Sequence, residues 1–411
     1  MGEIVVAAVG WFAAFAIALA GLVLGHDTVA AVALAAAAIT SLVARRLGSS
    51  SVLLDGIEAV GVAAVGVTLA ATAHTTAIIG ASAAIAFAAI VQQYAALVYA
   101  HIARRREALV GAPIGFIAMG GLVGFLLLGR PVLPLIALAC WAMVDATWSA
   151  IVRGLAIASA DIVLVRPPVL PPLYGRARWR RLGDGLVASR DPAFWGLVVA
   201  RPLARVLLQL VVELRFITPN RVTVLSIACC FGAAALIAAG GSVPLALVLI
   251  GIRSVLDSMD GQLARYRACG SNLGLYFDKV SDLFAWGSLF GALGIRAFTA
   301  TSSTAMLVLP LVAAIVLALC GFALWLARSL APSSSPPAPP VQLGFTAWAK
   351  SLWRIVLFEE PDFYVWIALA IATARYDVFV PFIAGAHAAR ALVVAIARAG
   401  SRFWIGKESP A

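Results

Sequence analysis

Long apolar stretches separated by short polar ones occupy most of this chain. A helix needs about 20 apolar residues to cross a bilayer, and each stretch approaches that length. We therefore predict six membrane-spanning helices in the first part of the chain. The stretches there run approximately over 4–24, 28–44, 54–73, 75–102, 109–129 and 132–152.

A second series of apolar stretches follows a polar interval. The chain has 411 residues, of which 63% are hydrophobic and 12% charged, which is more apolar than a soluble core requires. The pattern predicts an all-α polytopic membrane protein, with a six-helix domain preceded by about six further transmembrane helices. The second series runs approximately over 221–240, 243–265, 272–297, 303–327, 361–376 and 378–397.

Basic residues follow every second apolar stretch. In the first half they are Arg45–Arg46, Arg104–Arg106 and Arg153, and the second half shows the same alternation. Cytoplasmic loops are enriched in Lys and Arg, so we expect both ends of each half, and thus both termini, in the cytoplasm. Such loops account for the net charge of +11 without nucleic acid, and they suit membrane lipids and phosphate-bearing substrates. Abundant alanine and arginine favour a bacterial cytoplasmic membrane.

The polar interval between the two series is basic and rich in proline at its start. Beyond residue 193, Arg201, Arg205, Gln209 and Glu213 recur every four residues against apolar neighbours. This spacing predicts an amphipathic helix lying on the membrane surface. A seventh spanning helix is the alternative.

Four acidic residues stand out within the second apolar series. Asp257 and Asp260 are spaced i,i+3, and Asp278 and Asp282 are spaced i,i+4, so each pair shares one face of a helix. A short polar turn at 267–272 would fold the second helix back on the first and bring the four carboxylates together. Taken singly, each could be a solvated charge or an arginine partner. Together they predict a site for hard cations, Mg2+ or Mn2+, of which two could clamp a diphosphate.

The spacing around these acids resembles a known signature. The pattern D-x2-D-G-x2-A-R-x8-G-x3-D-x3-D, matched at all eight positions between Asp257 and Asp282, resembles that of the CDP-alcohol phosphotransferases. The segment Thr218–Asn220 is similar to the one that opens the first helix of that membrane domain. The resemblance runs from about Asp184 to the C-terminus.

The resemblance implies a role for each residue of the motif. Asp257, Asp260 and Asp278 would be metal ligands, and Asp282 the general base. The remaining positions would bind the donor nucleotide and its phosphates; they are Gly261, Ala264, Arg265, Gly274, Asn220 and Thr223.

The resemblance also implies the reaction. A CDP-linked donor would transfer its phosphoalcohol group to an acceptor hydroxyl with release of CMP, in phospholipid biosynthesis. We expect CDP-diacylglycerol as the donor. The segment from Asp184 to Arg190 resembles members that use inositol phosphate or other polyol phosphates, whereas Leu283 departs from many of them. A CDP-polyol donor or a diacylglycerol acceptor stays open, as does a homodimer, and the alternative from another class is a twelve-helix transporter.

These observations divide the chain into four expected regions. They are an N-terminal transmembrane region (1–165), a basic linker with an interfacial amphipathic helix (166–216), a catalytic membrane domain (217–400) and a cytoplasmic tail (401–411). Residues 48–61 weakly echo the motif, with Asp55 in the place of Asp278 and Ala59 in that of Asp282. The first half is either a degenerate repeat or similar by chance.

Polar residues inside the first series have a simpler interpretation. Gln92 and Gln93 lie within the fourth apolar stretch, and Asp145 lies within the sixth. Polar side chains at such depth commonly hydrogen-bond between helices. We therefore expect them to join neighbouring helices.

Overall fold

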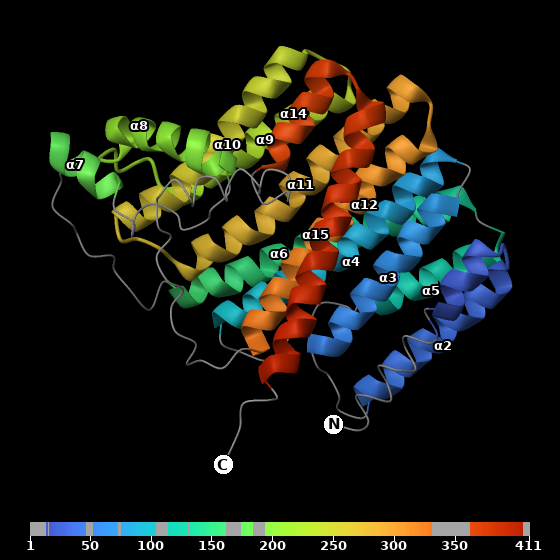
Figure 1. Ribbon diagram of the computed structural model, residues 1–411. Coiled ribbons are helices and arrows are strands. Elements are labelled where there is room, and N and C mark those ends of the chain that lie inside the picture. Colours follow the sequence, from blue (N-terminus) through green and yellow to red (C-terminus); the bar gives the residue numbers. More distant parts are fainter. Residues whose placement is uncertain are drawn as a thin grey trace. The chain divides into compact units, whose positions relative to one another are not determined.

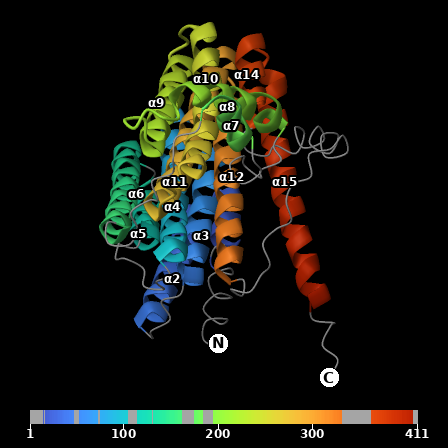
Figure 2. The same cartoon turned by 90° about the vertical axis from the view of Figure 1, so that its left-hand side faces the viewer.

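The computed structural model is helical throughout the part of the chain that it describes (Figure 1, Figure 2). The described residues are 14, 16–46, 52–72, 75–103, 114–129, 131–161, 174–183, 194–330 and 362–405. They include no strand, which confirms the expected all-α class. The chain divides into two compact units, residues 1–160 with 321–330 and residues 161–320 with 331–411.

The N-terminal unit is built from long apolar helices. They are α2 (Asp27–Arg46), α3 (Val52–Thr72), α4 (Thr76–Ala103), α5 (Ile114–Leu127) and α6 (Val132–Asp161). Helix α3 packs along α4, and α2 packs along α5. A Cβ atom at Gly66 would lie 2.7 Å from the Ser82 carbonyl oxygen, so glycine allows the backbones of α3 and α4 to approach closely.

A polar contact joins two of these helices. The Gln92 side-chain amide on α4 donates to Asp145 Oδ2 at 2.9 Å and to Ser149 Oγ at 3.3 Å, both on α6. The expected interhelical role of Gln92 and Asp145 is therefore confirmed. Glu58 and Arg153 are also buried in this unit.

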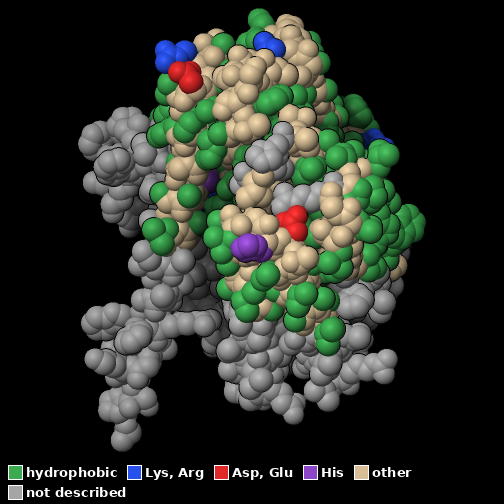
Figure 3. All heavy atoms as spheres, turned by 90° about the vertical axis from the view of Figure 1, so that its right-hand side faces the viewer, with side chains coloured by type: hydrophobic (Ala, Val, Ile, Leu, Met, Phe, Trp, Pro, Cys, Tyr) green, Lys and Arg blue, Asp and Glu red, His purple; other side chains and the backbone are tan. Residues whose placement is uncertain are grey.

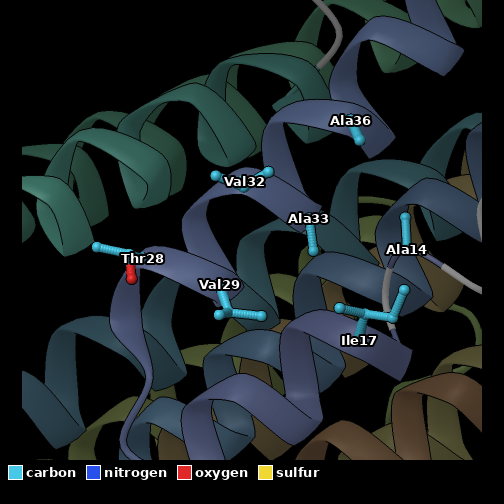
Figure 4. Close-up of a pocket in the computed structure, with 7 residues that line it drawn as sticks. All are labelled: Ala14, Ile17, Thr28, Val29, Val32, Ala33 and Ala36. Atoms are coloured by element: carbon cyan, nitrogen blue, oxygen red, sulfur yellow. The ribbon is translucent and has the colours of Figure 1, made fainter.

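The N-terminal unit also contains an open apolar hollow with a volume of about 570 Å³ (Figure 4). Figure 4 shows it beside α2, where the lining side chains are small or aliphatic apart from one hydroxyl. The described residues that line it include no titratable side chain. The lining residues are Ala14, Ile17, Thr28, Val29, Val32, Ala33 and Ala36.

The C-terminal unit begins with short helices and continues with long ones. They are α7 (Gly175–Leu182), the π-helical turn η1 (Gly196–Ala200), α8 (Arg201–Val211), α9 (Pro219–Ala238), α10 (Val243–Tyr266), α11 (Asn272–Thr301), α12 (Thr304–Leu330), α14 (Phe363–Thr373) and α15 (Tyr376–Ile405). The last ten residues of α12 belong to the N-terminal unit. Helix α9 packs against both α10 and α11, the two helices that carry the motif acids.

Each helix that carries the motif begins at a capping residue. The Thr218 hydroxyl accepts from the Arg221 backbone N–H, and Pro219 occupies the first turn of α9, which confirms the predicted helix opening. Ser242 caps α10 in the same way, with Pro244 in the first turn. Ser271 Oγ accepts from the Gly274 N–H and starts α11.

Five described helices are long and apolar enough to cross a membrane. They are Thr76–Ala103, Val132–Ser159, Pro219–Ala238, Asn272–Thr301 and Thr304–Gly321. Four shorter apolar helices fall in other predicted stretches, whereas the charged helix α10 is not among the candidates. Figure 3 shows one face of the molecule, on which hydrophobic side chains predominate and charged ones are few.

The polar interval differs from its expected form. Residues 166–216 were expected to contain a basic linker before one amphipathic helix, yet residues 175–182 of the linker form α7, whose Leu182 is buried in a cluster with Leu208 and Leu263. The polar stripe of α8 faces this helix: Arg178 Nη1 donates to the Gln209 carbonyl at 2.7 Å, and the Arg205 guanidinium lies 3.8 Å from the Trp179 ring centroid. Apolar side chains of α8, including Leu203 and Leu210, are exposed, as a surface helix requires.

Candidate functional site

The motif lies at the junction of α10 and α11. Helix α10 ends at Tyr266, and the chain reverses through a turn in which Ala268 has a φ of 50°. The Cys269 N–H donates to the Ala264 carbonyl at 3.0 Å, which closes the end of α10. After the reversal α10 and α11 both pack against α9, and side chains of the two helices meet beside it.

Three carboxylates converge at this junction. Asp257, Asp278 and Asp282 each offer one oxygen, and these oxygens lie within 4.8 Å of one another. Asp257 and Asp278 are half-buried, whereas Asp282 is only 5% exposed. Like charges this close repel one another unless cations compensate them.

Asp260, the fourth acid, points in a different direction. Its Oδ2 accepts a short hydrogen bond from the Thr223 hydroxyl on α9, and its Oδ1 accepts from the Gly261 N–H at 2.5 Å. Both residues of the Thr223–Asp260 pair are buried. Asp260 therefore lies outside the three-acid group, and the Thr223 hydroxyl binds a carboxylate of the motif.

A buried arginine that sequence reasoning missed lies among the acids. Arg253 is 1% exposed. It donates through Nη1 to Asp257 Oδ1 at 2.5 Å and through Nη2 to Asp282 Oδ1 at 2.6 Å. The available signal was a charged residue inside an apolar stretch, one helical turn before Asp257.

Lys279 adds a second positive charge on the exposed side of the cluster. Its Nζ lies 2.9 Å from Asp278 Oδ2 and 3.5 Å from Asp282 Oδ2. Its side chain is 33% exposed, so solvent screens these contacts more than those of Arg253.

The small residues of the motif lie at the same end of the helices. A Cβ atom at Gly261 would lie 3.1 Å from Arg265 Nη1, so the guanidinium crosses this glycine. A Cβ atom at Gly274 would lie 3.4 Å from Asn220 Oδ1, so the start of α9 lies beside the start of α11. Ala264 is half-buried, whereas Arg265 and Asn220 are exposed.

Helix α14 closes the buried side of the site. The Tyr364 ring centroid lies 5.9 Å from the Arg253 guanidinium carbon. Asp362, fully buried, accepts from the backbone N–H groups of Phe194 and Trp195, at 3.2 and 2.7 Å. The Trp195 indole N–H in turn donates to Ser254 Oγ on α10 at 2.9 Å. Tyr364 and Asp362 were not expected from the sequence.

The turn between α10 and α11 is held by a structural arginine. Arg267 donates to the carbonyls of Val212, Leu214 and Ile217, which follow α8. Burial raises the pKa of the neighbouring Cys269 thiol, and the Arg267 charge acts in the opposite direction. Cys269 is therefore a neutral thiol near pH 7, and the turn offers no thiolate nucleophile.

The donor atoms suit a divalent cation of the expected kind. Clustered carboxylate oxygens without cysteine or histidine are the ligands preferred by Mg2+ and Mn2+. Asp257 and Asp278 come from different helices, so a cation between them would also join α10 to α11.

Comparison with known proteins agrees with this geometry. A family model described as CDP-alcohol phosphatidyltransferase matches residues 216–374. A phosphatidylinositol phosphate synthase from Corynebacterium glutamicum is 33% identical over 105 residues, which make up 26% of this chain and 44% of that protein. The match thus spans less than half the length of this curated relative. No solved structure matches the chain.

The family match is narrower than the expected resemblance, which began near Asp184. It includes the three-acid group, Asp260 with its Thr223 partner, Arg253 and helix α14. The recognition made from the motif is confirmed, because the CDP-alcohol phosphatidyltransferase family model matches this part of the chain and the chain is also similar to the synthase relative.

Proposed function

We propose that this protein is a membrane phosphotransferase that transfers a phosphoalcohol group from a CDP-linked donor to an acceptor hydroxyl and releases CMP. The observation that carries the proposal is the convergence of Asp257, Asp278 and Asp282 within 4.8 Å. The family match over these residues supports it. A role in phospholipid biosynthesis agrees with the apolar helices around the site.

The residues divide the chemical work between them. Asp257 and Asp278, with Asp260 behind them, would hold Mg2+ or Mn2+, two ions in the fullest form of the site. Bound there, the cations would neutralise the diphosphate and the charge that develops on the leaving CMP. Asp282 would accept the proton of the acceptor hydroxyl while that oxygen bonds to the phosphorus bearing the alcohol. The bond from this phosphorus to the bridging oxygen breaks, and CMP leaves.

The nucleotide would lie over the small residues at the mouth of the site. Gly261, Ala264 and Gly274 leave room for a close approach of the cytidine diphosphate. Arg265, exposed next to Gly261, would pair with a phosphate, as a guanidinium group does well. Asn220 lies beside Gly274 and would provide a further polar contact.

The substrates are proposed by analogy. The similarity to the Corynebacterium phosphatidylinositol phosphate synthase favours CDP-diacylglycerol as donor and a polyol or inositol phosphate as acceptor. A CDP-polyol donor or a diacylglycerol acceptor would use the same acids. A carrier function would place polar groups on a path through both halves, whereas the motif acids gather at one helix junction.

We further propose that the active site faces the cytoplasm of a bacterial cell. The basic residues Arg265, Arg267 and Lys279 flank the junction of α10 and α11, as the positive-inside rule expects. CDP-linked donors are made and used on that side. The same rule places both termini in the cytoplasm.

The test is CMP release by the purified full-length protein. A panel of CDP-donors is offered with glycerol phosphate, inositol phosphate, inositol, serine or diacylglycerol, in the presence of Mg2+ or Mn2+. Acceptor-dependent CMP release with one pair would support the proposal and identify the substrates. A folded protein that binds Mn2+ but releases no CMP with any pair would refute it.

A further inference from the structure

Arg253 is a fully buried cation placed between two acids of different helices. Burying a guanidinium is costly unless opposite charges and hydrogen bonds compensate it. Here Asp257 on α10 and Asp282 on α11 provide the charges, at 2.5 and 2.6 Å. The arrangement thus joins a proposed metal ligand to the proposed base through one planar group.

The guanidinium uses only one oxygen of each acid. Both of its contacts go to Oδ1 atoms, and the Oδ2 atom of Asp282 faces Lys279 at 3.5 Å. Arg253 therefore restrains the rotation of each carboxylate through one oxygen and leaves the second oxygen to other partners, such as Lys279 at Asp282. A lysine at this place has a single nitrogen and could not match two acids with the same forked geometry.

Arg253 is itself held in place from α9 and α14. Its Nη1 donates to Ser226 Oγ at 2.7 Å, and the Ser226 hydroxyl donates to the Arg253 carbonyl at 3.1 Å. The Tyr364 ring lies on another side, 5.9 Å away. A cation fixed from several helices can act as a rigid reference for flexible carboxylates.

We propose that Arg253 is a positioning residue, which holds Asp257 and Asp282 facing each other across α10 and α11 before a divalent cation binds. The inference rests on the proposed function, in which Asp257 binds the metal and Asp282 accepts the proton. Hydrogen bonds to metal-ligating carboxylates fix their orientation, and losing such a partner commonly costs 10–100-fold in metal affinity or activity.

The experiment measures Mn2+ affinity of the full-length protein by electron paramagnetic resonance, together with CMP release. The variants are Arg253→Lys, which keeps the charge, and Ser226→Ala, which frees the guanidinium without altering any charge. We expect Arg253→Lys to weaken Mn2+ binding about tenfold or more and to lower kcat, with KM for the CDP-donor within a fewfold of normal. Ser226→Ala should shift both quantities in the same direction by a smaller factor.

Two control variants lie outside the site. Arg375→Lys alters an exposed ion pair with Asp377. Ser159→Ala removes an exposed hydroxyl that donates to the Ala156 carbonyl of its own helix, at 2.9 Å. Both should leave Mn2+ affinity and kcat unchanged.

Three results would overturn the proposal. The first is a folded Arg253→Lys protein with normal Mn2+ affinity and kcat. The second is tighter Mn2+ binding, which would make the guanidinium a competitor of the metal. If Arg253→Lys does not fold, unchanged Mn2+ affinity in Ser226→Ala decides against it. Wild-type protein that binds Mn2+ without releasing CMP would refute the proposed function only, because the Mn2+ comparison stands without turnover.

Discussion

The hydroxyl of Thr223 on α9 donates to the carboxylate of Asp260 on α10, and both side chains are buried. This bond turns Asp260 toward α9, while Asp257, Asp278 and Asp282 gather on the α11 side. A buried carboxylate that loses a donor keeps its desolvation cost, about 1–3 kcal/mol or more for a charged group. Thr223 therefore determines the orientation of Asp260 without itself being charged.

Replacing Thr223 by valine should separate this role from packing, because the two side chains have similar shapes. We expect Thr223→Val to destabilise the protein by about 1–3 kcal/mol and to lower CMP release about tenfold or more, whereas Thr223→Ser should retain most of both. Thermal unfolding and turnover are measured on the same preparations. Thr299→Val is the matched control, because that exposed hydroxyl donates only to the Arg296 carbonyl of its own helix. Normal turnover in folded Thr223→Val would contradict the assigned role.

The metal requirement is tested at the two acids that join α10 and α11. Asp257→Asn and Asp278→Asn should each abolish CMP release and weaken Mn2+ binding, because an amide carries no charge and ligates a hard cation poorly. Excess chelator should stop the wild-type enzyme, and added Mg2+ or Mn2+ should restore it. Asp377→Asn, at an exposed ion pair, should behave as wild type. Full CMP release in chelator would rule out the metal.

Asp282 requires a test that separates a base from a ligand. As the base it acts on the acceptor, so Asp282→Asn should lose turnover and retain affinity for the CDP-donor. The alternative is that Asp282 binds the metal, because a carboxylate oxygen of Asp282 lies within 4.8 Å of oxygens of Asp257 and Asp278. Loss of donor and Mn2+ binding in this variant would assign Asp282 to the metal instead. Near-normal turnover would exclude both roles.

The motif could be interpreted from the sequence because helical periodicity fixes which residues share a face. Spacings of three and four residues placed each pair of acids on one side of its helix, and the Thr218–Asn220 segment marked the start of α9. The periodicity does not say which way a carboxylate turns. Thr223 donates a hydrogen bond that orients Asp260 toward α9, and Arg253 donates hydrogen bonds that orient Asp257 and Asp282 toward its buried guanidinium group.

The missed residues share a physical reason. Arg253, Ser226 and Tyr364 act through contacts between helices, and a single sequence does not give the rotation of one helix against another. Of the three, Arg253 was the easiest to recognise from the sequence, because a charged residue in an apolar stretch requires a partner. Helix α7 was missed because prolines precede it, and its stability comes from packing on α8 and α10 rather than from its own eight residues.

The packing of α7 gives a prediction about stability. Trp179 stacks with Arg205 of α8, and Arg181 Nη2 donates to the Tyr266 carbonyl at the end of α10, at 2.8 Å. Trp179→Ala should expose α7 to limited proteolysis and lower the unfolding free energy by about 1–2 kcal/mol, through the lost cation–π and apolar contact. Arg176→Ala, at an exposed position of the same helix, is the control. Equal protease resistance of the two variants would show that the stacking contributes nothing.

The last prediction concerns the N-terminal half, which we expect to be dispensable for the chemical step. All residues of the proposed site, from Asn220 to Tyr364, lie within the compact unit formed by residues 161–320 and 331–411. In the weak echo of the motif in the first half, Asp55 and Glu58 are present, but alanine occupies the place of the base.

Replacing these two acids together in the 411-residue chain tests whether the N-terminal half takes part in the chemical step. Asp55→Asn with Glu58→Gln should leave turnover per folded molecule within a fewfold of normal. Because Glu58 is only 2% exposed, its loss should affect thermal stability more than chemistry.

A complementary truncation should begin near residue 166, since a start at Gly183 would remove α7 from its contacts with α8 and α10. The truncated protein should bind Mn2+ and release CMP. A dead double variant, or a folded truncated protein that binds donor yet is inert, would place part of the active site in the first half.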